Sequence, residues 1–183
     1  MPFEFERLKI PGLVVIRPRV FGDPRGYFLE TYKRSDFVAN GIDVNFTQDN
    51  LSASTRGVVR GLHYQVPPAA QGKLVSVVRG KVWDVAVDIR RNSPYFMKWE
   101  AVELSEDDRV MFYIPPGFAH GFAALSDEVH FLYKCTAEYS PAQERGIRWD
   151  DPQIDIQWPV ENPVVSHRDR RLPLLKNAVV FEE

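Results

Sequence analysis

Short runs of β-branched and aromatic residues recur along the chain, and Gly, Pro, Asp and Asn residues separate them. The strongest run covers residues 73–89. Within it, the apolar side chains of residues 83, 85, 87 and 89 alternate with Asp84, Ala86 and Asp88. This period of two predicts a strand that has one apolar face. Arg79-Gly80-Lys81 interrupts the run and predicts a tight hairpin connection.

The same pattern predicts further strands, and their number favours an all-β barrel or sandwich. A turn is expected at residues 21–26, and a short helix at residues 35–41, where Ser35 is a candidate N-cap and Gly41 a stop. Residues 138–183 are richer in Pro, Trp and Asp and predict a covering segment, so the 183 residues are expected to form one domain. The expected strands are 13–16, 27–32, 46–50, 58–65, 100–104, 110–114 and 129–136.

Composition narrows the choice of partners. The formal net charge of −2 gives no global reason to expect binding to nucleic acid or to an acidic membrane surface, so any anion site must be a local cluster. No run of ~18 apolar residues is present, and the N-terminus lacks the pattern of a signal peptide. The single cysteine, Cys135, excludes an internal disulfide and fits a reducing cytoplasm. A cytoplasmic protein is expected.

The strand predicted at residues 58–65 carries candidate chemistry. Arg60 and His63 lie three residues apart, and Gly61 between them permits a bulge or a close backbone approach. Lys73 follows after a short loop. Because buried cations are costly without an anion, a potential base beside two cations suits an anionic substrate. A core histidine hydrogen-bonded to the backbone remains the alternative interpretation of His63.

A metal-dependent cupin is another alternative. Such a site needs a second histidine two residues after the first, because alternate strand residues face one lumen. Gln65 occupies that position here, and only the Pro-Pro-Gly-Phe-Ala-His120 segment resembles a cupin metal motif. We therefore expect no metal. A non-catalytic sugar-binding module also stays open.

Several motifs together resemble the dTDP-4-dehydrorhamnose 3,5-epimerase family, from about Gly12 to Leu175. The resemblance implies a cupin-type jelly-roll β-barrel that needs no metal or cofactor. It also implies a homodimer that exchanges its N-terminal strands, within residues 1–32. The motifs are FGDPRGYF at 21–28, QDN at 48–50, RGLH at 60–63, QGKL at 71–74, WDVAVD at 83–88, IPPGFAHGF at 114–122, FLYK at 131–134, WDDP at 149–152 and WP at 158–159.

The resemblance also implies a reaction: inversion of C3 and C5 of dTDP-4-dehydro-6-deoxy-D-glucose to give dTDP-4-dehydro-L-rhamnose. His63 would be the base, and Asp169 would orient its imidazole. Tyr133 would return a proton from the opposite face, and Lys73 would stabilise the enolate charge on the C4 oxygen. Epimerisation at C3 or C5 alone, or isomerisation of the ketone, remains a related alternative.

Further residues are implied as substrate contacts. Arg25 and Arg60 would bind the diphosphate, and Tyr139 would stack on the thymine. Arg168 stands where the family usually has a lysine. In a strand-exchanged dimer, Arg25 would serve the neighbouring subunit's site. The remaining implied contacts are Glu30, Gln48, Asn50, His120 and Glu144.

Overall fold

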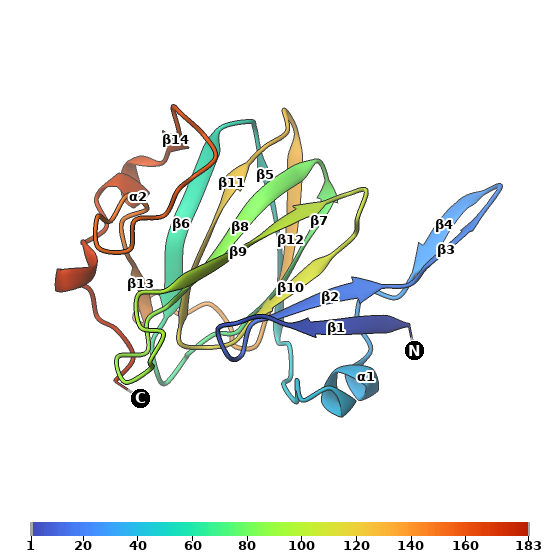
Figure 1. The fold of residues 1–183 in the computed structure, drawn as a ribbon, viewed down its shortest axis with the longest axis horizontal. Helices are drawn as coiled ribbons and strands as arrows, with labels where there is room; N and C mark the ends of the chain where they lie inside the picture. The colour runs from blue at the N-terminus through green and yellow to red at the C-terminus, as the bar shows by residue number, and fades with distance from the viewer. Residues whose placement is uncertain (1, 183) are drawn as a thin grey trace.

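The computed structural model describes residues 2–182, which form two facing antiparallel sheets (Figure 1). This arrangement confirms the all-β cupin-type jelly roll. The first sheet has the order β1 (Phe3–Arg7), β2 (Val14–Pro18), β10 (Met111–Ile114), β7 (Lys73–Arg79), β12 (Val129–Cys135) and β5 (Gln48–Ser54). The second has the order β13 (Glu144–Gly146), β6 (Val58–Gln65), β11 (Phe118–Ala124), β8 (Lys81–Asp88) and β9 (Trp99–Ser105), and β14 (Val164–Val165) pairs in parallel with β6.

Alternation along β8 divides the apolar side chains between two layers. Val82 and Ala86 face the main core between the sheets, whereas Val85, Val87 and Ile89 pack on the outer side. The predicted alternation is confirmed. Both faces are nevertheless buried, because the C-terminal part of the chain covers the outer side of this sheet.

The connection at Arg79-Gly80-Lys81 is tight, but the predicted hairpin is wrong. Strands β7 and β8 lie in different sheets, so this connection is a corner of the barrel. Gly80 has φ +77°, and a Cβ there would lie 2.1 Å from the carbonyl oxygen of Glu128. Only glycine fits such a corner.

Other expected boundaries shift. Residues 21–23 belong to β3 (Val20–Asp23), which pairs with β4 (Gly26–Leu29), so the turn is shorter than predicted. This hairpin projects away from the body of the molecule (Figure 1). The helix α1 (Arg34–Ala39) begins after Lys33 without a side-chain cap, so Ser35 is not its N-cap. Strand β5 begins two residues later than expected and extends to Ser54.

The segment after residue 138 lies against the outer face of the second sheet, where Ile147, Ile154 and Trp158 pack on Leu62 and Val85. It ends in α2 (His167–Arg170) and the short 3-10 helix η1 (Leu175–Asn177). Ser166 caps α2 by accepting a hydrogen bond from the backbone N–H of Asp169 at 3.0 Å. Among residues 2–182, no helix is both long and apolar enough to span a membrane.

Candidate active site

A bulge in β6 explains how Arg60 and His63 share a face despite their odd spacing. His120 of β11 pairs with His63, whereas Phe122 pairs with Arg60, so two residues of β6 oppose Gly121. A Cβ on Gly61 would lie 2.7 Å from the Cα of Gly121, and Gly61 has φ +127°. The bulge and the close approach, which Gly61 was expected to permit, are both present, and the extra residue returns the alternation to the inner face.

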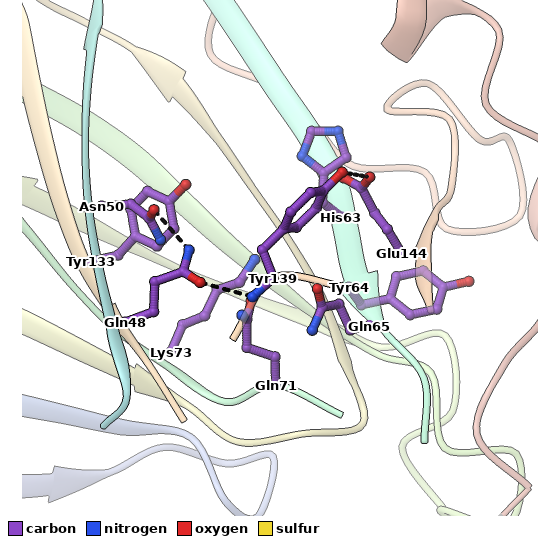
Figure 2. A pocket seen from close by; sticks show the side chains of 10 residues that line it. All are labelled: Gln48, Asn50, His63, Tyr64, Gln65, Gln71, Lys73, Tyr133, Tyr139 and Glu144. Atoms are coloured by element: carbon purple, nitrogen blue, oxygen red, sulfur yellow. Dashed lines mark hydrogen bonds between the residues drawn. The ribbon is translucent and has the colours of Figure 1, made fainter. Parts of the chain in front are cut away.

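A cavity of about 280 Å³ opens beside this strand (Figure 2). Seven of the predicted site residues line it, together with three that were not predicted as site residues. The predicted residues are Gln48, Asn50, His63, Lys73, Tyr133, Tyr139 and Glu144. The additional ones are Tyr64, Gln65 and Gln71. Polar groups therefore converge from both sheets, as in a site for a polar ligand.

His63 and Asp169 form a hydrogen-bonded pair on one wall of the cavity. The imidazole Nε2 lies 2.8 Å from Oδ1 of Asp169, and the backbone N–H of Gly61 donates to Oδ2 at 3.3 Å. Burial alone would raise the pKa of Asp169, but the bonds from His63 and Gly61 prevail and lower it. Asp169 is thus held as a carboxylate. In the tautomer whose Nε2–H donates its hydrogen bond to Asp169, the Nδ1 lone pair is free to act as a base.

Tyr133 and Lys73 come from the opposite sheet, and Figure 2 shows Tyr133 across the cavity from His63. The Lys73 ammonium lies 5.9 Å from the centre of the Tyr133 ring. Burial raises the pKa of Tyr133, so its phenol keeps its proton at neutral pH. Burial also lowers the pKa of Lys73, although nearby acidic groups oppose this shift. A developing anion would favour the charged ammonium.

A second histidine–carboxylate pair lies deeper in the barrel. Nε2 of His120 is 2.8 and 3.0 Å from the two carboxylate oxygens of Asp84, and the imidazole stacks on Phe131. Burial lowers the pKa of His120, which favours a neutral imidazole. Asp84 was not predicted as a site residue. Its place in the alternating strand could have indicated it, because a carboxylate on the inward face of a barrel strand needs a partner.

At the rim of the cavity, Glu144 joins two other predicted contacts. The Tyr139 hydroxyl donates to Oε2 of Glu144 at 2.7 Å, and Arg168 forms an ion pair with the same oxygen. Burial alone would raise the pKa of Glu144, but these two partners prevail and lower it. Arg168 therefore lies at the rim as a charged group, anchored by Glu144.

The structure does not bring every predicted residue to the cavity. Arg60 donates to Ser54 Oγ at 3.0 Å and to the carbonyl of Ala53 at 2.9 Å, outside the cavity lining. Arg25 pairs with Asp23 on the projecting β3–β4 hairpin, and Glu30 follows that hairpin. Neither residue lines the cavity of its own chain, and Figure 1 shows the β3–β4 hairpin projecting away from the barrel.

Residues 2–182 offer no cluster of metal-binding side chains. In the described part of the chain, no group of three His, Cys, Asp or Glu side chains could hold a metal ion. Gln65, which occupies the position of a second cupin ligand, is 3% exposed and makes hydrogen bonds to backbone groups.

Comparison with known proteins points to one family. A family model described as dTDP-4-dehydrorhamnose 3,5-epimerase matches residues 7–177. The dTDP-4-dehydrorhamnose 3,5-epimerase of Shigella flexneri is 54% identical over 164 residues, which cover 89% of this chain and 91% of the relative. A dTDP-4-dehydrorhamnose 3-epimerase of Streptomyces niveus is 42% identical over 93% of this chain and 83% of the relative.

Solved structures agree with the sequence matches. The dTDP-4-dehydrorhamnose 3,5-epimerase of Sulfolobus tokodaii superimposes with a TM-score of 0.94 at 47% identity, and all of both chains is covered. The dTDP-6-deoxy-D-glucose-3,5-epimerase of Legionella pneumophila Philadelphia 1, solved in complex with dTDP-4-keto-L-rhamnose, gives a TM-score of 0.92 at 45% identity and covers 96% of this chain and 94% of that chain. The matches and the site geometry agree: the chain belongs to the dTDP-4-dehydrorhamnose 3,5-epimerase family.

Proposed function

We propose that this protein inverts C3 and C5 of dTDP-4-dehydro-6-deoxy-D-glucose to give dTDP-4-dehydro-L-rhamnose, without a cofactor. One observation carries the proposal: the His63–Asp169 pair and Tyr133 lie on opposite walls of one cavity, with Lys73 beside Tyr133. Epimerisation next to a ketone needs a base on one face of the sugar and an acid on the other.

The proton transfers follow from this arrangement. Nδ1 of His63 removes the proton from C3 or C5, and Asp169 stabilises the imidazolium that forms. The electron pair of the broken C–H bond forms a double bond to C4, and the π pair of the C4 carbonyl moves to its oxygen, where the Lys73 ammonium stabilises the enolate. Tyr133 Oη then gives its proton to the same carbon from the other face. Solvent takes the proton from His63 and restores the one on Tyr133, so the enzyme is unchanged after each inversion.

Deuterium incorporation tests this function. The protein is incubated in deuterated water with dTDP-4-dehydro-6-deoxy-D-glucose, and NMR follows C3 and C5. We expect deuterium at both carbons and a product with both centres inverted. No exchange at either carbon would refute the proposal.

A single-centre epimerase is the second candidate, because the Streptomyces niveus relative is named as a 3-epimerase. The pair formed by His63 and Tyr133 serves one centre as well as two. The same NMR experiment decides, since deuterium and inversion confined to one carbon would establish the second candidate.

We also propose a homodimer in which the N-terminal region reaches the neighbouring subunit. Within the chain, β1 and β2 pair in the first sheet, so the projecting β3–β4 hairpin is the part free to reach out. Phe28 on this hairpin, and Leu51 and Val78 on the outer side of the first sheet, are more than half exposed. Apolar exposure of this kind favours a protein interface. Arg25 would then complete the partner's diphosphate site.

Mixing two inactive variants tests this arrangement. Arg25→Ala and His63→Ala proteins are dissociated together and reassociated. If Arg25 acts on the partner's site, each mixed dimer has one site with both residues, and activity returns. Light scattering measures the dimer. A monomer, or no regain of activity on mixing, would contradict the proposal.

We further propose that the protein works in the cytoplasm, where its nucleotide-sugar substrate would be available. The buried free thiol of Cys135 suits a reducing compartment. Cell fractionation with an activity assay tests this location, and activity confined to a secreted fraction would contradict it.

A further inference from the structure

The residues that present Tyr139 to the cavity are held by side-chain amides. They follow β12 as a short connection without regular structure, residues 136–140. Such a connection cannot rely on strand pairing to fix its backbone. Three glutamine side chains from three separate segments bind it instead, and all three line the cavity.

Gln65, at the end of β6, makes the central contacts. Its Nε2 donates to the carbonyl of Glu138 at 3.1 Å and to that of Ala69 at 2.8 Å, while its Oε1 accepts from the backbone N–H of Ser140 at 2.8 Å. The side chain is 3% exposed. One buried amide therefore holds the backbone on both sides of Tyr139.

The other two glutamines bind the remaining positions. Gln71 donates from Nε2 to the carbonyl of Ala137 at 2.7 Å. Gln48 accepts the backbone N–H of Tyr139 at 2.8 Å through Oε1, and its Nε2 donates to Asn50 at 3.0 Å. Figure 2 shows the contact between Gln48 and Tyr139. Each residue from 137 to 140 thus gives one backbone group to a glutamine amide.

We propose that Gln48, Gln65 and Gln71 act as an amide clamp that positions Tyr139 for nucleotide binding. The inference rests on the proposed function, in which Tyr139 stacks on the base. It also adds to the expected role of Gln48. Gln48 lines the cavity, and its amide also holds the backbone of Tyr139, so it acts as a positioning residue in addition to its expected ligand contact.

Burial and exposure support the clamp. The Tyr139 side chain is half exposed, and its ring is fixed by its backbone and by the bond from its hydroxyl to Glu144. Without the clamp, the ring would have to be ordered when the nucleotide binds, which lowers affinity. The groups proposed for catalysis, His63, Lys73 and Tyr133, lie on strands outside this connection. The clamp should therefore affect nucleotide affinity and leave the chemical step unchanged.

Gln65→Leu is the main test, because it keeps the size of the side chain and removes both polar ends. Calorimetry measures the binding of dTDP. Steady-state kinetics with the 4-keto sugar nucleotide give KM and kcat. We expect dTDP affinity to fall and KM to rise by about tenfold, with kcat within about twofold of the wild type. Gln157→Leu is the matched control. Gln157 is exposed and bonds only to Asp155, so no change is expected.

A double-mutant cycle separates positioning from a general structural role. Tyr139→Ala removes the stacking ring and should weaken dTDP binding by about tenfold. If Gln65 acts through Tyr139, adding Gln65→Leu to Tyr139→Ala should cost less than about twofold more. If the two substitutions weaken dTDP binding independently, so that their fold-changes multiply, the proposal is overturned.

Two further variants keep the test decisive. If Gln65→Leu fails to fold by circular dichroism, Gln65→Glu and Gln71→Leu replace it and should show the same split between KM and kcat. Wild-type dTDP affinity in a folded clamp variant would overturn the clamp. A wild-type protein that binds dTDP but exchanges no deuterium would refute the proposed function, and the dTDP cycle would still test the clamp.

Discussion

Two histidine–carboxylate pairs, those of His63 and His120, have their histidines on neighbouring strands, and the difference between them is informative. His63 of β6 lies opposite His120 of β11 in the strand register, and each Nε2 approaches a carboxylate oxygen at 2.8 Å. The side chain of His63 is 31% exposed and lines the cavity, whereas that of His120 is 8% exposed. The same chemical pair can thus face a substrate or be sealed in a wall.

The carboxylates also come from different places. Asp84 lies on β8, next to the strand of His120, so that pair belongs to the sheet itself. Asp169 comes from α2, in the segment that covers the second sheet, and Ser166 fixes the start of that helix. A base needs access to substrate and a partner for its charged form, and only the His63 pair offers both. We therefore expect the two pairs to respond differently to substitution.

The largest effect is expected for His63→Ala. Loss of the general base should reduce deuterium exchange at C3 and C5 by about 10³-fold, within the range usual for such groups. His130→Ala is the matched control, because His130 pairs with Glu128 away from the cavity. Exchange in His63→Ala at the wild-type rate would remove His63 as the base.

Asp169→Asn should have the next largest effect. An amide keeps the shape but cannot stabilise the imidazolium, so exchange should fall by about 10²-fold. Proton exchange measured by NMR at several pH values checks this result. If the variant keeps more than half of the wild-type rate, the paired carboxylate is not needed.

Asp84→Asn should behave differently. Because the pair is sealed, the exchange rate should change by less than tenfold, whereas the free energy of unfolding should fall by about 2 kcal/mol through loss of a buried charge-assisted bond. Urea denaturation measures the stability. If Asp84→Asn slowed exchange as much as Asp169→Asn and left the stability unchanged, the two pairs would be equivalent and the expectation would be wrong.

The smallest effect concerns acid stability. The pKa of Asp169 is lowered in the folded protein, so near the unfolded value of about 3.9 the unfolded chain binds more protons. Its stabilising contribution is present above that pH and is lost as the pH falls through the folded pKa. Between pH 6 and 3, the wild type should therefore lose more stability than Asp169→Asn. Urea denaturation at each pH measures the free energy of unfolding. An equal loss in the two proteins between pH 6 and 3 would contradict this expectation.

Local sequence patterns predicted much of the fold, and they identified His63 of the His63–Asp169 pair as a candidate base. Alternation along β8 and the run of strands indicated the barrel, and Gly61 marked a place where a bulge or a close backbone approach was permitted. The corner at Gly80 could not be told from a hairpin, because the same turn residues serve both and only the sheet pairing distinguishes them.

Contacts between residues far apart in the sequence were harder to predict. Asp169 follows His63 by 106 residues, and only the family resemblance connected them. Gln65 was considered only as a missing metal ligand, because nothing local indicates that its amide holds residues 138–140. The proposed role of Arg25 depends on a second subunit, which one sequence does not provide.

The central claim is that His63 and Tyr133 serve opposite faces of the sugar. Tyr133→Phe tests it most directly, with the 4-keto sugar nucleotide in deuterated water followed by NMR. Phenylalanine keeps the ring but removes the acid, so His63 alone can return the proton. We predict deuterium exchange with retention of configuration, and inversion slower by at least about 10²-fold. Inversion at the wild-type rate would contradict the account.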